Sequence, residues 1–530
     1  MKRKVLRVLC LKSILLSVLS GFLSCRTQDS DHPSNSIGNP VSIRMHLLGS
    51  DYDGNSGSQS SRSSVQGSVE QKIVIISPSE FIRVSNESVS NSGVSGSLAS
   101  SGSTYLAAGD PLANGVKFRV LVYDSNGNYK ISQDYTVGQP ATPMLLDAGV
   151  TYTIIAYSYN SNTLPSLSPS EQGTLSSSRV LYDDSNRDFM YFNTSFTPSG
   201  NGDILNITLR HKLSNVIISV NDITNTGITS IVNSSLSSHY SNGNFSLSNG
   251  NVSVSGIPSV SSLTFESSQF NPSVVSAVSD RMFINTGTSS GSTVSSSFTG
   301  DITIGGVTKT ISLPNGFTIK PGYQQTFNVD LTRCGAYLGA SGTNWKNFMC
   351  QNLGADTSLD PFIPAAGIHG AKYQWGYKPV NANVSDSRYY TQSDDQSNSG
   401  TIPGWNQSFL PTTNWSDTSK TVNDPCPTGY RVPTLSQWQS VINNNTNVQY
   451  IGNWFNSPTN YTSGVLIGTR LFLPTAGGRY AQDSGQLLDN GLYGYYWTSS
   501  AYSMFAFSNG NINIGSTSWN DGFPVRCIAQ

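Results

Sequence analysis

The last third of the chain contains the stretch Asp424-Pro-Cys-Pro-Thr-Gly-Tyr-Arg-Val-Pro-Thr-Leu-Ser-Gln-Trp438, which combines a cysteine, a turn, a short strand and the start of a helix. Thr434 begins the capping-box pattern Thr434-Leu-Ser-Gln437, in which two side chains satisfy backbone N–H groups at a helix start. Apolar side chains then recur at helical spacing, at Leu435, Trp438, Val441 and Ile442. The pattern predicts a helix over about residues 434–444, ending in Asn443-Asn-Asn445.

The composition indicates a β-rich chain of several domains. At 530 residues the chain exceeds a single hydrophobic core. Charged residues are 12% of the chain and the mean hydropathy is −0.23, so the polarity comes from Ser, Asn, Thr and Gly. Such residues favour turns between short strands. The formal net charge is −1, and five basic residues without an acidic one lie in residues 1–24. The rest of the chain is therefore acidic, which argues against a nucleic-acid partner.

The first 24 residues are predicted to be a lipoprotein signal peptide. A basic segment precedes the apolar run 14–23, which is too short to span a bilayer at about 20 residues per helix. Small residues followed by Cys25 resemble a bacterial lipobox, although Phe22 and Leu23 match it imperfectly. We therefore expect lipidation at Cys25, a polar tether over residues 25–40 and attachment to the outer membrane or cell surface. An ordinary secretory signal is the alternative.

The other cysteines suggest disulfides rather than a metal site. Apart from Cys10 and Cys25 in the targeting segment, the chain has Cys334, Cys350, Cys426 and Cys527. An even number of cysteines in an exported protein suggests two disulfides, for which three connectivities exist. Their spacing matches no zinc pattern, and no metal or cofactor is expected.

Residues 41–331 contain β-branched runs separated by Gly, Asn, Ser and Pro, which predict an all-β region of sandwiches. A boundary near residue 200 is suggested by Thr197-Pro-Ser-Gly-Asn-Gly-Asp203. Three stretches carry a resemblance: Phe118-Arg-Val-Leu-Val-Tyr-Asp-Ser-Asn-Gly127, Gly149-Val-Thr-Tyr-Thr-Ile-Ile-Ala-Tyr-Ser-Tyr-Asn160 and Leu209-Arg-His-Lys-Leu-Ser-Asn-Val216. They look like the fimbrillin-like proteins of Bacteroidetes. The resemblance implies two transthyretin-like β-sandwiches, over 41–199 and 200–331, in a protein that builds or anchors surface fimbriae. It also implies processing at an arginine, for which Arg62 and Arg83 are candidates that the sequence does not distinguish.

Residues 332–530 contain all the tryptophans: Trp345, Trp375, Trp405, Trp415, Trp438, Trp454, Trp497 and Trp519. Six motifs occur in order: Trp345-Lys-Asn-Phe-Met-Cys-Gln-Asn-Leu353, Tyr373-Gln-Trp-Gly376, Cys426-Pro-Thr-Gly-Tyr-Arg-Val-Pro-Thr434, Leu473-Pro-Thr-Ala-Gly-Gly478, Tyr496-Trp-Thr-Ser-Ser500 and Gly522-Phe-Pro-Val-Arg-Cys527. Together they resemble the Fibrobacter succinogenes major paralogous (FISUMP) domain, which implies an α+β, C-type-lectin-like fold. The resemblance also implies the disulfides Cys426–Cys527 and Cys334–Cys350.

Catalysis is not expected. The FISUMP domain resembles the formylglycine-generating enzymes, which need active-site cysteines, whereas the four cysteines here are accounted for as disulfides. No nucleophile elbow, metalloprotease motif or phosphate loop occurs. The scattered residues His32, His46, His211, His239 and His369, and the pair Asp394-Asp395, are interpreted as surface residues.

Aromatic and amide side chains near the C-terminus are the candidate ligand-binding residues. Trp519-Asn520-Asp521 copies a tripeptide of calcium-dependent lectins, but its Glu-Pro-Asn or Gln-Pro-Asp partner is missing, so a β-turn beside a buried Trp is the preferred interpretation. Tyr495 and Tyr496, with Tyr493 and Tyr502 nearby, have side chains suited to stacking on sugar rings, whereas Trp497 is assigned to the core.

The sequence therefore predicts a mainly β, lipid-anchored surface protein. The first hypothesis is an adhesin-like protein that binds a glycan or a host or matrix protein, as an accessory or tip component of fimbriae. The alternative is a structural fimbrial subunit or anchor without a ligand of its own. Other fimbrial subunits are expected partners in both cases.

Overall fold

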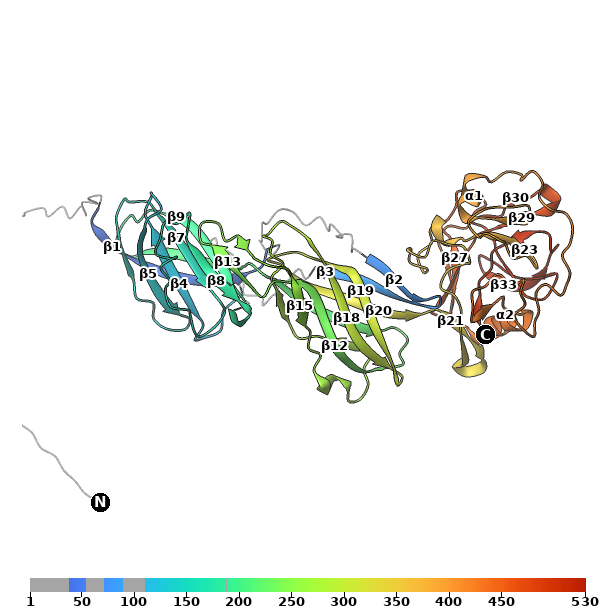
Figure 1. The fold of residues 1–530 in the computed structure, drawn as a ribbon, viewed down its shortest axis with the longest axis horizontal. Helices are drawn as coiled ribbons and strands as arrows, with labels where there is room; N and C mark the ends of the chain where they lie inside the picture. Colours follow the sequence, from blue (N-terminus) through green and yellow to red (C-terminus); the bar gives the residue numbers. More distant parts are fainter. Residues whose placement is uncertain (1–37, 54–70, 89–109, 187) are drawn as a thin grey trace, which may run out of the picture.

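The computed structural model describes residues 38–53, 71–88, 110–186 and 188–530, and the chain is mainly β as predicted. Two β-sandwiches and a C-terminal domain follow one another along the long axis of the molecule (Figure 1). The strand β1 lies at one end and the C-terminal domain at the other. The predicted signal peptide and Cys25 lie outside the described residues. No helix in the described part of the chain is both long enough and apolar enough to cross a membrane.

The first sandwich is built from one large sheet and one small sheet. The large sheet has the order β5 (Tyr129–Thr136), β4 (Lys117–Tyr123), β7 (Tyr152–Ser158), β9 (Met190–Phe196), β10 (Asp203–His211), β1 (Pro40–Asp51) and β6 (Met144–Asp147). The small sheet has the order β14 (Val252–Ser253), β13 (Asn242–Ser246) and β8 (Arg179–Asp183). Both faces of β4 and β7 are buried, which explains why these strands are almost continuously hydrophobic.

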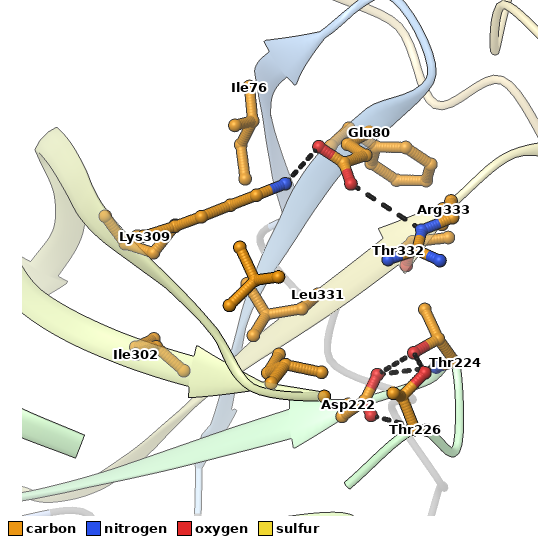
Figure 2. Close-up of a pocket in the computed structure, with 15 residues that line it drawn as sticks. Ile76, Glu80, Asp222, Thr224, Thr226, Ile302, Lys309, Leu331, Thr332 and Arg333 are labelled. Carbon is orange, nitrogen blue, oxygen red and sulfur yellow. Dashed lines mark hydrogen bonds and ion pairs between the residues drawn. The ribbon is translucent and has the colours of Figure 1, made fainter. Parts of the chain in front are cut away.

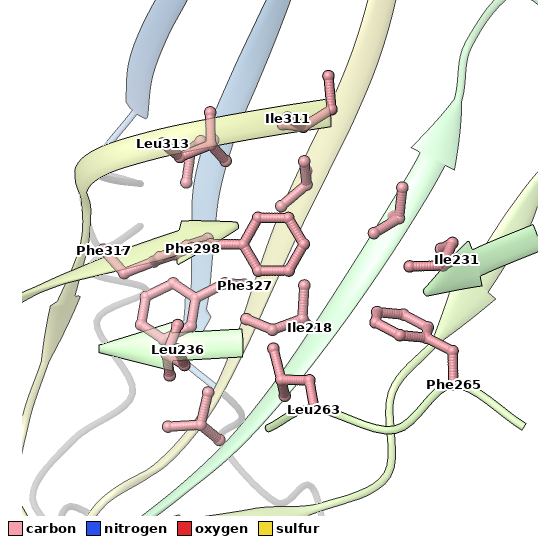
Figure 3. Close-up of a cluster of buried hydrophobic side chains, with 14 of the residues drawn as sticks. Ile218, Ile231, Leu236, Leu263, Phe265, Phe298, Ile311, Leu313, Phe317 and Phe327 are labelled. Carbon is pink, nitrogen blue, oxygen red and sulfur yellow. The ribbon is translucent and has the colours of Figure 1, made fainter. Parts of the chain in front are cut away.

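The second sandwich encloses the largest apolar core. One sheet has the order β16 (Ser276–Val278), β11 (Ser214–Asp222), β20 (Gln324–Arg333), β3 (Glu80–Ser88) and β2 (Gln71–Ser77), and β17 (Met282–Ile284) also pairs with β11. The other has the order β15 (Ser259–Ser262), β12 (Ile228–His239), β18 (Val294–Ile304) and β19 (Val307–Ile319). Figure 3 shows Ile218 and Phe327 of the first sheet beside Phe298 and Leu313 of the second. These side chains alternate with polar ones along their strands, as expected where one sheet face is buried.

The strands of the two sandwiches are interleaved in sequence. The strands β2 and β3 belong to the second sandwich, although they precede most of the first, and β3 pairs with β20 from Ser88↔Gln325 to Glu80↔Arg333. Conversely, β13 comes from the second region of the sequence and pairs with β8 of the first sandwich. The expected ranges 41–199 and 200–331 therefore do not separate the sheets, because strand pairing joins segments that are distant in sequence.

The C-terminal domain, residues 334–530, consists of short strands around an aromatic core. The largest of its sheets has the order β24 (Tyr389–Tyr390), β23 (Lys372–Gln374), β34 (Gly522–Phe523), β29 (Gly478–Tyr480) and β30 (Gln486–Leu488). Two three-stranded sheets have the orders β26 (Val448–Ile451), β27 (Gly464–Ile467), β28 (Leu471–Pro474) and β31 (Gly494–Trp497), β32 (Ser503–Ser508), β33 (Asn511–Ser516). Two strand pairs are β21 (Gly335–Gly339) with β22 (Thr343–Asn347), and β25 (Tyr430–Arg431) with β35 (Ile528–Ala529). The α-helices are α1 (Gln392–Ser397) and α2 (Leu435–Asn444). In the part of the chain that the structure describes, the 3₁₀ turns are η1 (Asp184–Asn186), η2 (Ser267–Phe270), η3 (Ala340–Gly342), η4 (Ala366–Ile368) and η5 (Ala481–Asp483).

The predicted helix is confirmed as α2. Thr434 is its N-cap and accepts a hydrogen bond from the Gln437 backbone N at 3.0 Å, while the Gln437 side chain accepts one from the Thr434 backbone N at 2.8 Å. Trp438 and Val441 are buried beneath it. Immediately before the helix, β25 pairs with β35, so the stretch 424–438 lies beside the C-terminal end of the chain.

The disulfides are Cys334–Cys350 and Cys426–Cys527, the same pairs that the FISUMP resemblance implies. Cys426 and Cys527 lie in the aromatic core with Trp375, Trp415 and Trp497. Cys334 and Cys350 instead pack against Phe81 of β3, at the border with the second sandwich.

The turn between β2 and β3 joins the second sandwich to the C-terminal domain. The backbone N of Cys334 donates to the Ser79 carbonyl and that of Cys350 to the Pro78 carbonyl, both at 2.8 Å. Ser79 is 1% exposed, and its hydroxyl accepts from the Tyr430 hydroxyl at 2.8 Å. Arg83, one of the two candidate processing sites, lies within β3 and pairs with Asp360 at 2.6 Å; Arg62 lies outside the described residues. The C-terminal domain is therefore fixed to the second sandwich by a segment from the N-terminal part of the chain.

Candidate binding surfaces

The tyrosines predicted to bind ligand are part of the core. Tyr496 is fully buried, donates its hydroxyl hydrogen bond to the Pro474 carbonyl at 3.0 Å and accepts one from the Asn352 side chain. Tyr495 is 8% exposed and donates to Asp489 Oδ2 at 3.0 Å. The strand β31, which contains both, is buried on both faces. The prediction that Tyr495 and Tyr496 face a ligand is wrong, because their rings and hydroxyls are used within the domain.

The tripeptide Trp519-Asn520-Asp521 is also buried and hydrogen-bonded internally. The Asp521 carboxylate accepts from the Ala481 backbone N at 2.8 Å and from the Thr517 hydroxyl at 2.7 Å. The Asn520 amide donates to the Gln407 carbonyl at 3.0 Å. The Asp521 backbone N donates to the Ser518 carbonyl, which closes a turn. Burial raises the pKa of the Asp521 carboxyl, which opposes the ionised form that Ca²⁺ requires. These contacts describe a turn beside the buried Trp519, which is the interpretation preferred from the sequence, and they occupy the polar groups of Asn520 and Asp521 that a ligand would need.

A surface cluster of aromatic rings surrounds Trp519. The Tyr502 ring stacks on Trp519 with centroids 4.1 Å apart, and Phe409 meets Trp519 edge-on at 5.0 Å. Tyr502 is 50% and Phe409 54% exposed, whereas Trp519 is 8% exposed. We call Phe409, Tyr502 and Trp519 the Trp519 platform. The sequence placed Tyr502 only near the candidate residues, and no pattern around Phe409 marked that residue as part of a site.

The indole N–H of Trp519 and the backbone of Tyr502 bear on the role of the Trp519 platform. Most indole N–H groups of the domain are paired, for example those of Trp375 with the Thr498 carbonyl and Trp497 with the Tyr373 carbonyl. The indole N–H groups of Trp519 and of Trp454, which packs against the core, have no hydrogen-bond partner among the described residues. Tyr502 has a φ of +64°, a left-handed backbone conformation that is costly for a bulky side chain. The Tyr502 backbone is therefore strained in the conformation that stacks its exposed ring on Trp519.

Several ionisable groups interpreted as surface residues are in fact buried. Asp395 is 5% exposed and binds both Lys372 Nζ, at 2.9 Å, and Arg479 Nε, at 2.7 Å, two cations that are fully buried. His369 is 2% exposed, and burial together with the charge of Lys372 lowers its pKa to about 3. His211 and His239 are also buried. Asp395 is surrounded by polar residues in the sequence, which is why its burial was not predicted. The Asp395 network holds strands together and is closed to solvent.

A groove opens along the side of the second sandwich, where its two sheets end in the edge strands β2 and β19. The groove is a cavity of about 330 Å³, and Figure 2 shows Ile76, Ile302 and Leu331 among the residues that line it. Glu80 is neutralised there by Lys309 at 2.6 Å and by Arg333 at 3.6 Å. Asp222 accepts hydrogen bonds from Thr224 and Thr226 in an adjacent turn. Because the charges are satisfied internally, the groove offers apolar surface, including Val307, which is 58% exposed.

The sequence of the two sandwiches is similar to that of a known protein family. Residues 101–345 match the model of a family described as fimbrillin-like. No curated protein matches the chain. Solved structures with weaker likeness include a candidate cell adhesion protein from Bacteroides uniformis (13% identity, TM-score 0.30, 41% of this chain and 87% of that one). Another is a candidate cell adhesion protein from Bacteroides fragilis (14% identity, TM-score 0.29, covering 49% of this chain and 93% of that one). The sequence match covers most of both sandwiches and the first strands of the C-terminal domain, so the fimbrillin-like resemblance is supported there.

Proposed function

We propose that the protein is an adhesion protein of the outer membrane or cell surface, anchored through lipid at Cys25, in which two sandwiches carry the C-terminal domain as the binding module. The observation that carries the proposal is the Trp519 platform, because exposed stacked rings are costly to leave in water and are typical of binding sites. The fimbrillin-like match and the position of the C-terminal domain at the end of the molecule support it. The FISUMP, C-type-lectin-like assignment of this domain is part of the proposal, and no catalytic role is assigned to it.

The groove beside β2 and β19 favours a second candidate function, that of a structural fimbrial subunit. Two edge strands with unpaired backbone groups and an apolar floor offer a docking place for a segment of another subunit. In this alternative the C-terminal domain acts as a spacer or anchor. The two functions differ in whether the C-terminal domain has a ligand of its own.

An array of glycans and matrix proteins tests the first function. We expect the whole chain to bind at least one component, and the double variant Phe409→Ser, Tyr502→Ser to bind it at least tenfold more weakly, because aromatic anchors dominate contact energies. The variant Phe455→Ser is the matched control, since Phe455 is 54% exposed, as Phe409 is, but lies outside the platform. Silence of the whole chain on the array, together with co-purification with fimbriae, would establish the structural alternative.

A further inference from the structure

The C-terminal domain contains a pocket, distinct from the Trp519 platform, beside the second sandwich. This pocket of about 240 Å³ is lined by Tyr337, Trp345, Asn444, Asn447, Thr469 and Arg470, and we call it the Trp345 pocket. Its walls are the β21–β22 hairpin, the end of α2 and the turn between β27 and β28. The volume is smaller than that of typical drug-sized sites, which begin at about 300 Å³, and suits a single small ring.

The aromatic wall of the pocket is held in a fixed orientation. The rings of Tyr337 and Trp345 meet edge-on with centroids 5.1 Å apart. The Trp345 indole N–H donates to Asn347 Oδ1 at 2.7 Å, and the Arg470 guanidinium lies 5.4 Å from the Trp345 ring centroid. Trp345 and Tyr337 are each partly exposed. A preorganised aromatic surface of this kind binds the C–H face of a saccharide ring without losing side-chain freedom.

The polar wall provides hydrogen-bonding groups of both kinds. Asn444, the last residue of α2, donates its amide N–H groups to the carbonyls of Leu338 and Ser440, which leaves its side-chain oxygen as an acceptor. Asn447 and Thr469 are exposed at the rim. Arg470 donates to the Ile223 carbonyl at 2.9 Å and has further N–H groups for a ligand.

The electrostatics favour an uncharged ligand. Arg470 would attract an anion, but the carboxyl end of α2, which also lines the pocket, carries the negative end of the helix dipole. For a carboxylated ligand, the attraction of Arg470 and the repulsion of the helix end oppose each other. A hydroxyl group can instead donate to the Asn444 side-chain oxygen and accept from Arg470.

We propose that the Trp345 pocket binds one neutral pyranose ring of a glycan. The sugar stacks its apolar face on one ring of the Tyr337–Trp345 pair, whose planes meet at 74°, and its hydroxyls pair with Asn444, Asn447 and Arg470. This proposal rests on the proposed function, because it names a ligand class and a site for the binding module. The pocket adds a specific monosaccharide contact to the broader aromatic contact of the Trp519 platform.

Ligand-observed NMR and titration of the whole chain with glucose, galactose, mannose and N-acetylglucosamine test the proposal, with glucuronic acid as the anionic comparison. We expect at least one neutral sugar to bind more tightly than glucuronic acid. The variant Thr469→Trp fills the pocket from an exposed position, and Trp345→Leu removes the aromatic wall. Each is expected to weaken binding of that sugar at least tenfold. Thr413→Trp, at another exposed threonine, and Trp454→Leu, at another partly buried tryptophan, are the matched controls and are expected to leave affinity within twofold.

The outcomes separate this proposal from the proposed function. Equal sugar binding by the Thr469→Trp and Thr413→Trp variants would overturn the pocket, as would tighter binding of glucuronic acid or no sugar binding at all. If the whole chain still bound an array component in any of these cases, the adhesion function would stand and the pocket alone would fall. The thermal unfolding of the Thr469→Trp variant is expected to match that of the unaltered chain. Weaker sugar binding by this variant would then reflect the filled pocket and not a loss of folding.

Discussion

Replacing Cys426 and Cys527 together by serine is expected to lower the free energy of unfolding of the C-terminal domain by about 4–5 kcal/mol. The bond closes a loop with a sequence separation of 101 residues, and a loop of that length gains much conformational freedom in the unfolded chain when it is opened. The domain has mostly short strands joined by long connections, so few other constraints replace the bond. Tryptophan fluorescence during denaturant unfolding measures the effect in this domain alone, because all eight tryptophans lie within it.

The matched control for this prediction is the double replacement of Cys334 and Cys350. Their sequence separation is 16, for which the chain-entropy estimate is about 3 kcal/mol. The Cys334 and Cys350 variant should therefore be the more stable of the two. Equal losses, or a larger loss for the Cys334 and Cys350 variant, would contradict the role assigned to the Cys426–Cys527 bond.

Replacing Asp395 by alanine is expected to cost about 3–5 kcal/mol, because it leaves two buried cations without a counter-charge. Asp395 lies on α1 and joins Lys372 of β23 to Arg479 of β29, the two strands on either side of β34. Burial lowers the pKa of Lys372, and the charge of Asp395 opposes that shift. Denaturant unfolding followed by tryptophan fluorescence measures the loss.

Two further variants test the explanation for Asp395. Lys372→Met removes the surplus positive charge and keeps the Asp395–Arg479 pair, so it should cost clearly less than Asp395→Ala. Asp356→Asn, at a surface carboxylate that accepts from Ser358 in the same domain, should cost less than about 1 kcal/mol. If Lys372→Met were as destabilising as Asp395→Ala, uncompensated buried charge would not be the cause of the loss.

Local patterns in the sequence predicted local structure well. The α2 helix was predictable because its N-cap, its capping-box glutamine and its apolar face all lie within ten residues of one another. The disulfide pairs followed from the FISUMP resemblance, since the residues alone left three connectivities open. The β-rich character followed from the composition and the runs of β-branched residues.

Features that depend on long-range packing were not predictable. β3 pairs with its sequence neighbour β2 on one side, but its partner on the other side is β20, more than 200 residues away, and no local signal marks that pairing. Tyr495 and Tyr496 are buried together because β31 is covered on both faces, whereas an exposed strand face would have left one of them free. Tyr502 lies in a loop and itself has a left-handed backbone conformation, which no pattern in the sequence indicates. Asp395 is buried because two cations distant in sequence converge on it.

The most direct test of the central claim compares the whole chain with a chain that ends at Arg333, on the same glycan and matrix-protein array. The shorter chain carries Phe81→Ser, because removal of the C-terminal domain exposes this otherwise buried ring. Circular dichroism first verifies that its sandwiches are folded. We predict that the whole chain binds and that the shorter chain does not rise above background. Equal binding by the two chains would contradict the claim that the C-terminal domain is the binding module.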